Sequence, residues 1–215
     1  MDHLPIVAAG REVPDAVNRI RRYCGLSWSG GQPQTWAWHY YDAVASQADD
    51  VVTATDVVCA AALHPGLSRS DLEFFRERQD ELSAWLGEVP TEKRLWELSL
   101  GDIDHVAALP ESFPDISVSL LSKVLHRKRP HCIPPIDRHV IDWYRPVTGK
   151  RAMTEAWDPI MRAMREEELD SARRLFLALV LGEIAEELWP NAAAFDRPQL
   201  SWIRAIDIAI WMDSR

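Results

Sequence analysis

The helical spacing of apolar residues is the feature that most constrains how this chain can fold. Apolar residues recur three and four positions apart along nearly the whole sequence, and no run alternates between apolar and polar residues as a half-buried strand would. Prolines and small hydroxyl residues mark several helix starts, among them Pro14, Thr53 and Pro198. The sequence therefore predicts an all-α fold.

Chain length and composition set the scale of that fold. With 215 residues, of which 47% are hydrophobic, the chain can bury one large core or the cores of two smaller lobes that share an interface. No long linker and no internal repeat divides the sequence. We therefore expect a single helical domain over residues 1–215, with a two-lobed arrangement left open.

The sequence lacks the signals of an exported or membrane-bound protein. No stretch approaches the roughly 20 apolar residues of a membrane span, and Met1–Pro5 lacks the basic start of a signal peptide. The cysteines at 24, 59 and 132 form no C-x-x-C pair, and no histidine pair has a metal-binding spacing with a third ligand. We expect a cytoplasmic protein without membrane contact, disulfide framework, metal site or cofactor.

Charge is unevenly distributed along the chain. The formal net charge of −9 argues against a uniformly basic nucleic-acid binder. Within residues 123–151, the basic segment, eight lysine and arginine residues accompany two aspartates, a local charge of +6 that leaves −15 for the rest. This segment is where the sequence predicts that an anion binds.

The densest group of cations in the basic segment is the run Arg127, Lys128 and Arg129. Adjacent cations at a helix end can displace counterions from a nucleic-acid backbone. Together with Lys123 and Arg138, they are the predicted phosphate contacts. An acidic face inside the protein is the alternative partner for the same charges.

The segment 113–144 contains the most informative motif. It reads F-P-D-I-S-V-S-L-L-S-K-V-L-H-R-K-R-P from Phe113 and runs on to I-P-P-I-D-R-H-V, which ends at Val140. The closing I-D-R-H-V resembles the part of helix-hairpin-helix DNA glycosylases that carries their catalytic aspartate, which corresponds to Asp137. The wider pattern, including R-A-I-D-I-A-I-W-M up to Met212, also resembles an uncharacterised bacterial domain family.

The resemblance implies a helix-hairpin-helix glycosylase-like fold with double-stranded DNA as the partner of the basic segment. In that superfamily the hairpin reads L-P-G-V-G and its backbone N–H groups hold a phosphate, a contact to which Ser117 and Ser119 correspond here. Both glycines are missing, and Asp115 replaces the first. A carboxylate about 6 Å from a phosphate costs on the order of 1 to 3 kcal/mol, so the hairpin is expected to be degenerate.

Asp137 follows two prolines and precedes an apolar helix, so the sequence alone predicts a helix N-cap. The resemblance adds a catalytic role, in which its carboxylate activates water or stabilises an oxocarbenium ion. Lyase-type glycosylases carry a nucleophilic lysine 18 positions earlier, where this chain has Ser119. Lys123 lies one helical turn further, about 6 Å along the helix, so a monofunctional reaction with water is expected.

Other side chains near this motif are candidates for the same site. His139 is a candidate for protonating the leaving base. Trp36 and Tyr40, one turn apart, and Trp143 and Tyr144, just after Asp137, are candidates for a pocket that stacks against a planar ligand. Ordinary core packing is the alternative for these aromatic residues.

Three functions remain open on the sequence. The first is DNA binding with monofunctional N-glycosylase activity. The second is a DNA-binding or protein-binding module that kept the scaffold without catalysis. The third is an enzyme that acts on a small nucleoside-like metabolite, which the acidic net charge permits.

Overall fold

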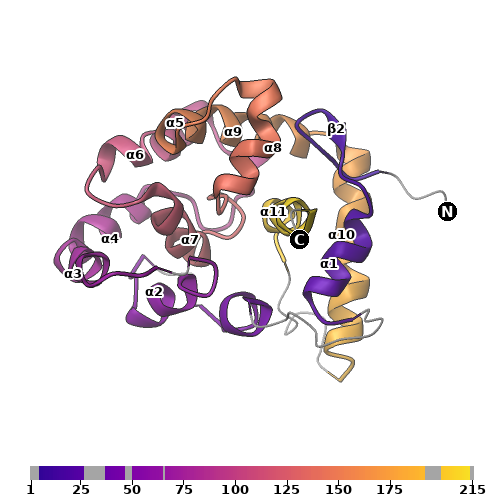
Figure 1. Cartoon of the computed structure of the whole chain (residues 1–215), viewed down its shortest axis with the longest axis horizontal. Helices are drawn as coiled ribbons and strands as arrows, with labels where there is room; N and C mark the ends of the chain where they lie inside the picture. The colour runs from indigo at the N-terminus through magenta and orange to yellow at the C-terminus, as the bar shows by residue number, and fades with distance from the viewer. Residues whose placement is uncertain (1–4, 27–36, 47–49, 65, 192–199, 214–215) are drawn as a thin grey trace.

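Helices account for most of the computed structural model, which describes residues 5–26, 37–46, 50–64, 66–191 and 200–213 (Figure 1). The elements in chain order are β1 (Val7–Ala8), β2 (Arg11–Glu12), α1 (Ala16–Tyr23), the π-helical turn η1 (Trp38–Asp42), α2 (Ala54–Ala60), α3 (Arg69–Glu77), α4 (Gln79–Gly87), the short helix η2 (Leu95–Glu97), α5 (Leu100–Ala107), α6 (Leu109–Ser112), α7 (Val118–Lys128), α8 (Arg138–Thr148), α9 (Met153–Glu168), α10 (Ser171–Leu188) and α11 (Trp202–Asp213). The predicted all-α class is confirmed in this coarse sense. Within the described ranges, no helix is both long and apolar enough to cross a membrane.

Within the described residues, the β-structure is a short hairpin near the N-terminus, made of two strands of two residues each. Strands β1 and β2 pair antiparallel, with Val7 opposite Glu12. Ala9 and Gly10 form the turn, with φ angles of 56° and 70°, the left-handed pair that a tight hairpin needs. The N–H group of Ala9 donates to Glu167 Oε1 at 2.6 Å, and this hydrogen bond attaches the hairpin to α9.

Helix starts follow local sequence signals in part. Thr53 begins α2 as predicted, and its side chain forms a reciprocal capping box with Asp56. Pro14 precedes α1, which begins after Asp15. The predicted start at Pro198 lies outside the described residues.

Helix α11 occupies the centre of the fold. Figure 1 shows it nearly end-on, with α1 and α10 on one side and α7 on the other. Each side chain from Trp202 to Ile210 is buried, and α1 and α8 pack against this helix. A helix that is buried on all sides brings its polar residues into the interior, and α11 carries Arg204 and Asp207.

The motif segment 113–144 begins just after α6 and folds into a turn, α7, a connecting loop and the first part of α8. No residue of the fully described turn between α6 and α7 has a left-handed backbone. Asp115 in this turn is exposed, and its carboxylate lies 3.3 Å from the guanidinium of Arg78. The turn therefore uses backbone conformations open to any residue, in keeping with its two missing glycines.

The side chains of Arg127, Lys128 and Arg129 are buried, with exposed fractions of 3%, 1% and 2%. Arg127 Nε and Lys128 Nζ lie 3.1 and 2.9 Å from the carboxylate of Asp56, and Arg129 pairs with Asp50. The prediction that this run contacts phosphate is wrong, because α7 is buried along its length and its cations need counter-charges inside. The alternative of an internal acidic partner is confirmed.

Removing Asp56 tests this interior charge balance. Asp56→Ala leaves Arg127 and Lys128 buried without their shared carboxylate, so we expect the free energy of unfolding to fall by about 3 to 5 kcal/mol. Chemical denaturation measures the change. The matched control is Asp142→Ala on α8, whose ion pairs with Arg138 and Arg145 are exposed and worth at most about 1 kcal/mol. Equal losses in the two variants would contradict the structural role of Asp56.

Candidate functional site

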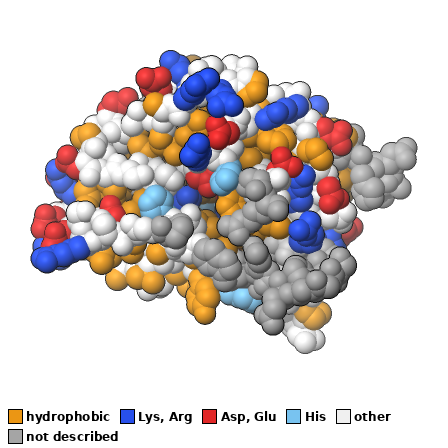
Figure 2. Space-filling view, in the orientation of Figure 1, with side chains coloured by type: hydrophobic (Ala, Val, Ile, Leu, Met, Phe, Trp, Pro, Cys, Tyr) orange, Lys and Arg blue, Asp and Glu red, His pale blue; other side chains and the backbone are white. Residues whose placement is uncertain are grey.

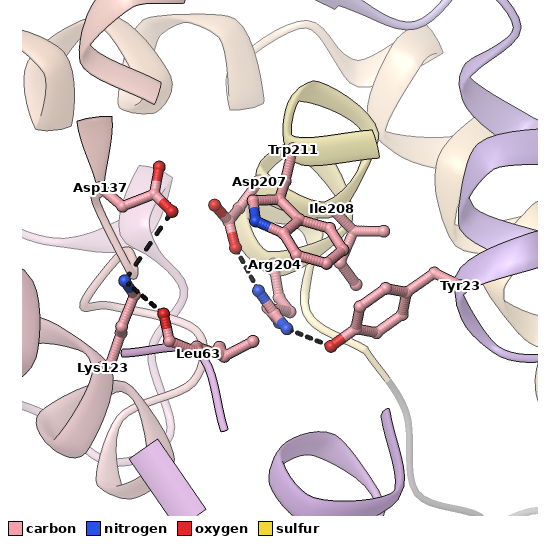
Figure 3. Close-up of a pocket in the computed structure, with 8 residues that line it drawn as sticks. All are labelled: Tyr23, Leu63, Lys123, Asp137, Arg204, Asp207, Ile208 and Trp211. Carbon is pink, nitrogen blue, oxygen red and sulfur yellow. Dashed lines mark hydrogen bonds and ion pairs between the residues drawn. The ribbon is translucent and has the colours of Figure 1, made fainter. Parts of the chain in front are cut away.

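A pocket of about 250 Å³, its open mouth included, lies where α7, the head of α8 and α11 meet. Figure 3 shows its lining, formed by Tyr23, Leu63, Lys123, Asp137, Arg204, Asp207, Ile208 and Trp211. The residues come from segments far apart in the sequence. The pocket therefore exists only in the folded chain, and it combines two cations with two carboxyl groups.

Asp137 both caps a helix and faces the pocket. Its Oδ1 accepts hydrogen bonds from the backbone N–H groups of His139 and Val140 at 2.8 and 3.3 Å, at the start of α8. Its Oδ2 lies 3.8 Å from Lys123 Nζ, and the side chain is 15% exposed. The predicted N-cap is confirmed, and the second carboxylate oxygen is directed toward the pocket (Figure 3).

Lys123 lies inside the same pocket. Its Nζ donates to the carbonyl oxygen of Leu63 and to Ser119 Oγ, both at 3.2 Å, and the side chain is 4% exposed. Burial lowers the pKa of the Lys123 amine, although the neighbouring carboxylate of Asp137 acts in the opposite direction. The prediction that Lys123 contacts a DNA phosphate is wrong, because its amine is buried and already bonded to acceptors of the protein. Although Lys123 lies one helical turn beyond Ser119, its amine still lies beside the carboxylate of Asp137.

Arg204 is the centre of a buried hydrogen-bonded cluster beside the pocket. Its Nε and Nη2 lie 2.8 Å from the two carboxylate oxygens of Asp42, and Nη2 also donates to the hydroxyl oxygen of Tyr23 at 2.6 Å. Arg204 Nη1 bonds to Asp207 one turn along α11. The Tyr23 hydroxyl group donates to Asp42 at 2.6 Å. Four of the five guanidinium N–H donors are therefore hydrogen-bonded, which fixes the group in position.

The carboxyl group of Asp207 is buried and titrates far from its usual range. Burial raises its pKa to about 7; the nearby Asp137 adds to the shift, whereas Arg204 and Lys123 oppose it. Lys123 and Arg204 balance two of the three carboxylates of Asp42, Asp137 and Asp207. A proton on Asp207 neutralises the remaining charge, so near neutral pH the site contains a carboxyl group that can give up a proton.

Several predicted site residues do not meet Asp137 in this pocket. The backbone N–H group of His139 donates to Asp137, but the His139 side chain does not line the pocket. Tyr40 is 65% exposed, and Tyr144 is fully buried with its hydroxyl group donating to Glu167 at 2.7 Å. Trp143 donates its indole N–H to the Ala8 carbonyl oxygen. The prediction that these three aromatic residues line the pocket of Asp137 is wrong, because their side chains contact the core, the hairpin or solvent instead. The fourth predicted aromatic residue, Trp36, lies outside the described residues.

The structure adds site residues that the sequence reasoning missed. Tyr23 and Trp211 provide the aromatic part of the lining, and Asp207 and Arg204 provide charge. A signal for the charged pair was present, since Arg204 and Asp207 stand three positions apart in an otherwise apolar helix. The aromatic pair had no local signal. Across the described ranges, no three histidine, cysteine, aspartate or glutamate side chains gather in a way that could hold a metal ion.

The surface charge of the basic segment is smaller than its sequence predicts. Of the other predicted phosphate contacts, Ser117 is exposed and Ser119 is half-buried. The Arg138 side chain is 91% exposed, and the carboxylate of Asp142 lies 3.7 Å from it. Arg145 is also exposed and pairs with Asp142 at 3.1 Å. Figure 2 shows lysine and arginine side chains mixed with acidic ones over this face of the molecule, with several basic side chains along its upper edge.

The protonation of Asp207 links stability to pH. Because its folded-state pKa lies above its ordinary value of 3.8, its stabilising contribution is complete below about pH 4 and is lost as the pH rises through about 7. Asp207→Asn lacks this dependence. We therefore expect the wild type to lose on the order of 2 kcal/mol of unfolding free energy relative to this variant between pH 5 and pH 8. Chemical denaturation of both proteins at the two pH values measures the change. Parallel pH profiles would contradict a protonated Asp207.

Comparison with known proteins assigns the chain to a family. The model of a family of unknown function, DUF6308, matches residues 16–214. No curated protein and no solved structure matches the chain. The resemblance to helix-hairpin-helix glycosylases thus finds no support in these comparisons and remains a hypothesis about fold and activity. The matched range covers more than nine-tenths of the sequence, and the chain belongs to the DUF6308 family.

Proposed function

We propose that the protein is an enzyme that cleaves an N-glycosidic bond by a monofunctional reaction, on a scaffold like that of the helix-hairpin-helix DNA glycosylases. The observation that supports this most directly is the pairing of two carboxyl groups in one pocket. Asp137 caps α8 and faces Lys123, whereas Asp207 has a pKa raised to about 7 by burial. Two carboxyl groups that titrate apart can take different roles in one reaction.

In the proposed reaction, the bond between the sugar and the base breaks, and its electron pair leaves with the base. Asp207 donates its proton to the departing base nitrogen. The carboxylate of Asp137 stabilises the positive charge on the sugar and accepts a proton from the water molecule that attacks the anomeric carbon. His139, the candidate acid on the sequence, gives way to Asp207 because the His139 side chain does not line the pocket.

Lys123 is a positioning residue in this mechanism. Its amine lies within 3.8 Å of three acceptors, namely Leu63 O, Ser119 Oγ and Asp137 Oδ2, which matches the three donors of an ammonium group. An ammonium group has no lone pair with which to attack a sugar. Water therefore stays the nucleophile, as the position of Ser119 also implies.

We propose double-stranded DNA as the carrier of the scissile nucleotide. The members of the basic segment that remain exposed are Arg138, Arg145, Lys150 and Arg151, on α8 and just after it. Asp137 stands at the head of the same helix, so a backbone bound along these side chains passes close to the pocket mouth.

A free nucleoside-like metabolite is the second candidate substrate. The burial of Arg127, Lys128 and Arg129 favours it, because these cations are withdrawn from any DNA surface. The exposed arginines of α8 are also partly neutralised by Asp142.

Substrate panels test the proposal. Duplexes that contain assorted damaged or modified bases, followed by alkaline cleavage of abasic sites, detect base excision from DNA, and chromatography of free bases detects nucleoside hydrolysis. We expect Asp137→Asn to lower the rate by about 10² to 10⁴-fold, because a charge that stabilises the transition state is lost. The matched control, Asp158→Asn on α9, removes a partly exposed carboxylate that lies outside both the pocket and the basic segment, and it should keep the wild-type rate. Release of no base from either panel would leave a binding scaffold without catalysis.

Borohydride reduction tests the assignment of water as the nucleophile. An imine between a lysine and the sugar would be reduced to a stable covalent adduct, which migrates more slowly on a denaturing gel. We expect no adduct with wild-type protein and a substrate that it cleaves. An adduct that disappears in Lys123→Gln would show instead that the amine attacks the sugar.

A further inference from the structure

A second pocket, of about 440 Å³ with its open mouth, lies at the N-terminal end of α11. It shares no lining residue with the pocket that contains Asp137. Its polar lining comes from Arg94 before η2, His131 after α7, Glu168 at the end of α9, Arg174 on α10 and Ser201 before α11. Segments distant in the sequence thus place two guanidinium groups, an imidazole, a hydroxyl and a carboxyl group around one cavity.

Glu168 is the unusual member of this lining. The residue is 2% exposed, and its Oε2 has no hydrogen-bond partner among the described residues. Burial raises the pKa of Glu168 to about 7, against the effects of a hydrogen bond from the Trp96 backbone and of Arg94 and Arg174, and with a small addition from Glu97. A buried polar atom without a partner is costly, so this oxygen is a candidate for contact with a ligand.

Arg174 is held rigidly beside Glu168. Its guanidinium carbon lies 4.0 Å from the ring centre of Trp96, and Nη1 donates to the Glu168 carbonyl oxygen at 2.9 Å. An arginine that is fixed in advance loses less side-chain entropy when it binds an anion.

The start of α11 adds to the positive potential of the pocket. Leu200, Ser201 and Trp202 line it, and Ser201 Oγ accepts the N–H group of Arg204 at 3.1 Å. The first N–H groups of a helix carry partial positive charge and attract anions. Helix α11 runs for 12 residues, long enough for this effect.

We propose that this pocket binds a small oxyanion, the phosphate or carboxylate group of a metabolite, with Arg94 and Arg174 supplying positive charge and the Glu168 carboxyl group donating a hydrogen bond. Burial and Arg94 lower the pKa of His131, so its imidazole is neutral near pH 7. The lining then carries two positive charges and no negative one when Glu168 is protonated. A cationic ligand would face both arginines. The site is independent of the proposed glycosidic activity.

Proton linkage makes the proposal measurable. The charged and titratable groups around Glu168 are Arg94, Glu97, His131, Cys132 and Arg174. Burial raises the pKa of the Cys132 thiol to about 12 and lowers the pKa of His131 below its ordinary value of 6.5, so Glu168 is the member of this group whose pKa burial raises into the range between pH 6 and 8. An oxyanion that requires its proton should bind nearly tenfold more tightly at pH 6 than at pH 8.

Sulfate is the first probe, because its charge does not change over this pH range. Titration of sulfate into the full chain, followed through the backbone amide signals of Glu168 and Trp202 by nuclear magnetic resonance at pH 6 and pH 8, measures the affinity at each pH. Inorganic phosphate and acetate, each at pH 6, then distinguish a tetrahedral anion from a carboxylate as the preferred group.

Variants connect the binding to the proposed residues. Glu168→Gln keeps a hydrogen-bond donor at every pH, so it should bind sulfate with the pH dependence removed. Arg174→Ala should weaken binding at least tenfold, and Arg94→Ala on the exposed side of the pocket gives the same test if the first variant does not fold. The matched control is Arg173→Ala, the preceding residue, which does not line this pocket and should bind normally. No binding, tighter binding at pH 8, or equal losses in Arg173→Ala and Arg174→Ala would each overturn the proposal.

Discussion

The guanidinium of Arg204 fixes the relative positions of three parts of the chain that are far apart in sequence. It is buried on α11 and bonds to Tyr23 of α1, to Asp42 of η1 and to Asp207 on its own helix. A buried cation is tolerated only when counter-charges and hydrogen bonds surround it. The hydrogen bonds from Arg204 to Tyr23 and Asp42 therefore fix where α1 and η1 lie against α11. They thereby shape the pocket into which Asp137 and Lys123 project.

Buried charge is a general feature of this interior. Arg127, Lys128 and Arg129 are as deeply buried as the apolar core, and they form ion pairs with Asp56 and Asp50. Such ion pairs add little net stability compared with apolar contacts, but breaking one partner away is costly, so they favour one arrangement of the helices over others. The formal charge of a stretch of sequence is therefore a poor guide to surface potential when half of its cations serve the core.

Helix α11 connects the two pockets. Its first turn lines the pocket of Glu168, and the side chains of Arg204, Asp207 and Trp211 line the pocket of Asp137. Each pocket holds an arginine next to a carboxyl group whose pKa burial raises to about 7. The common cause is the central position of α11, since polar groups at a buried helix are desolvated whichever end of it they meet.

The sequence by itself determined the helical class, the helix start at Thr53 and the capping position of Asp137, because periodicity and capping depend on residues within a few positions of one another. It also singled out the segment 113–144. Which cations face solvent, which aromatic residues line a pocket and which acid accompanies Asp137 were decided by the tertiary structure. Those properties depend on contacts such as Arg127 with Asp56, 71 positions apart, and Arg204 with Asp42, 162 positions apart, which no local pattern encodes.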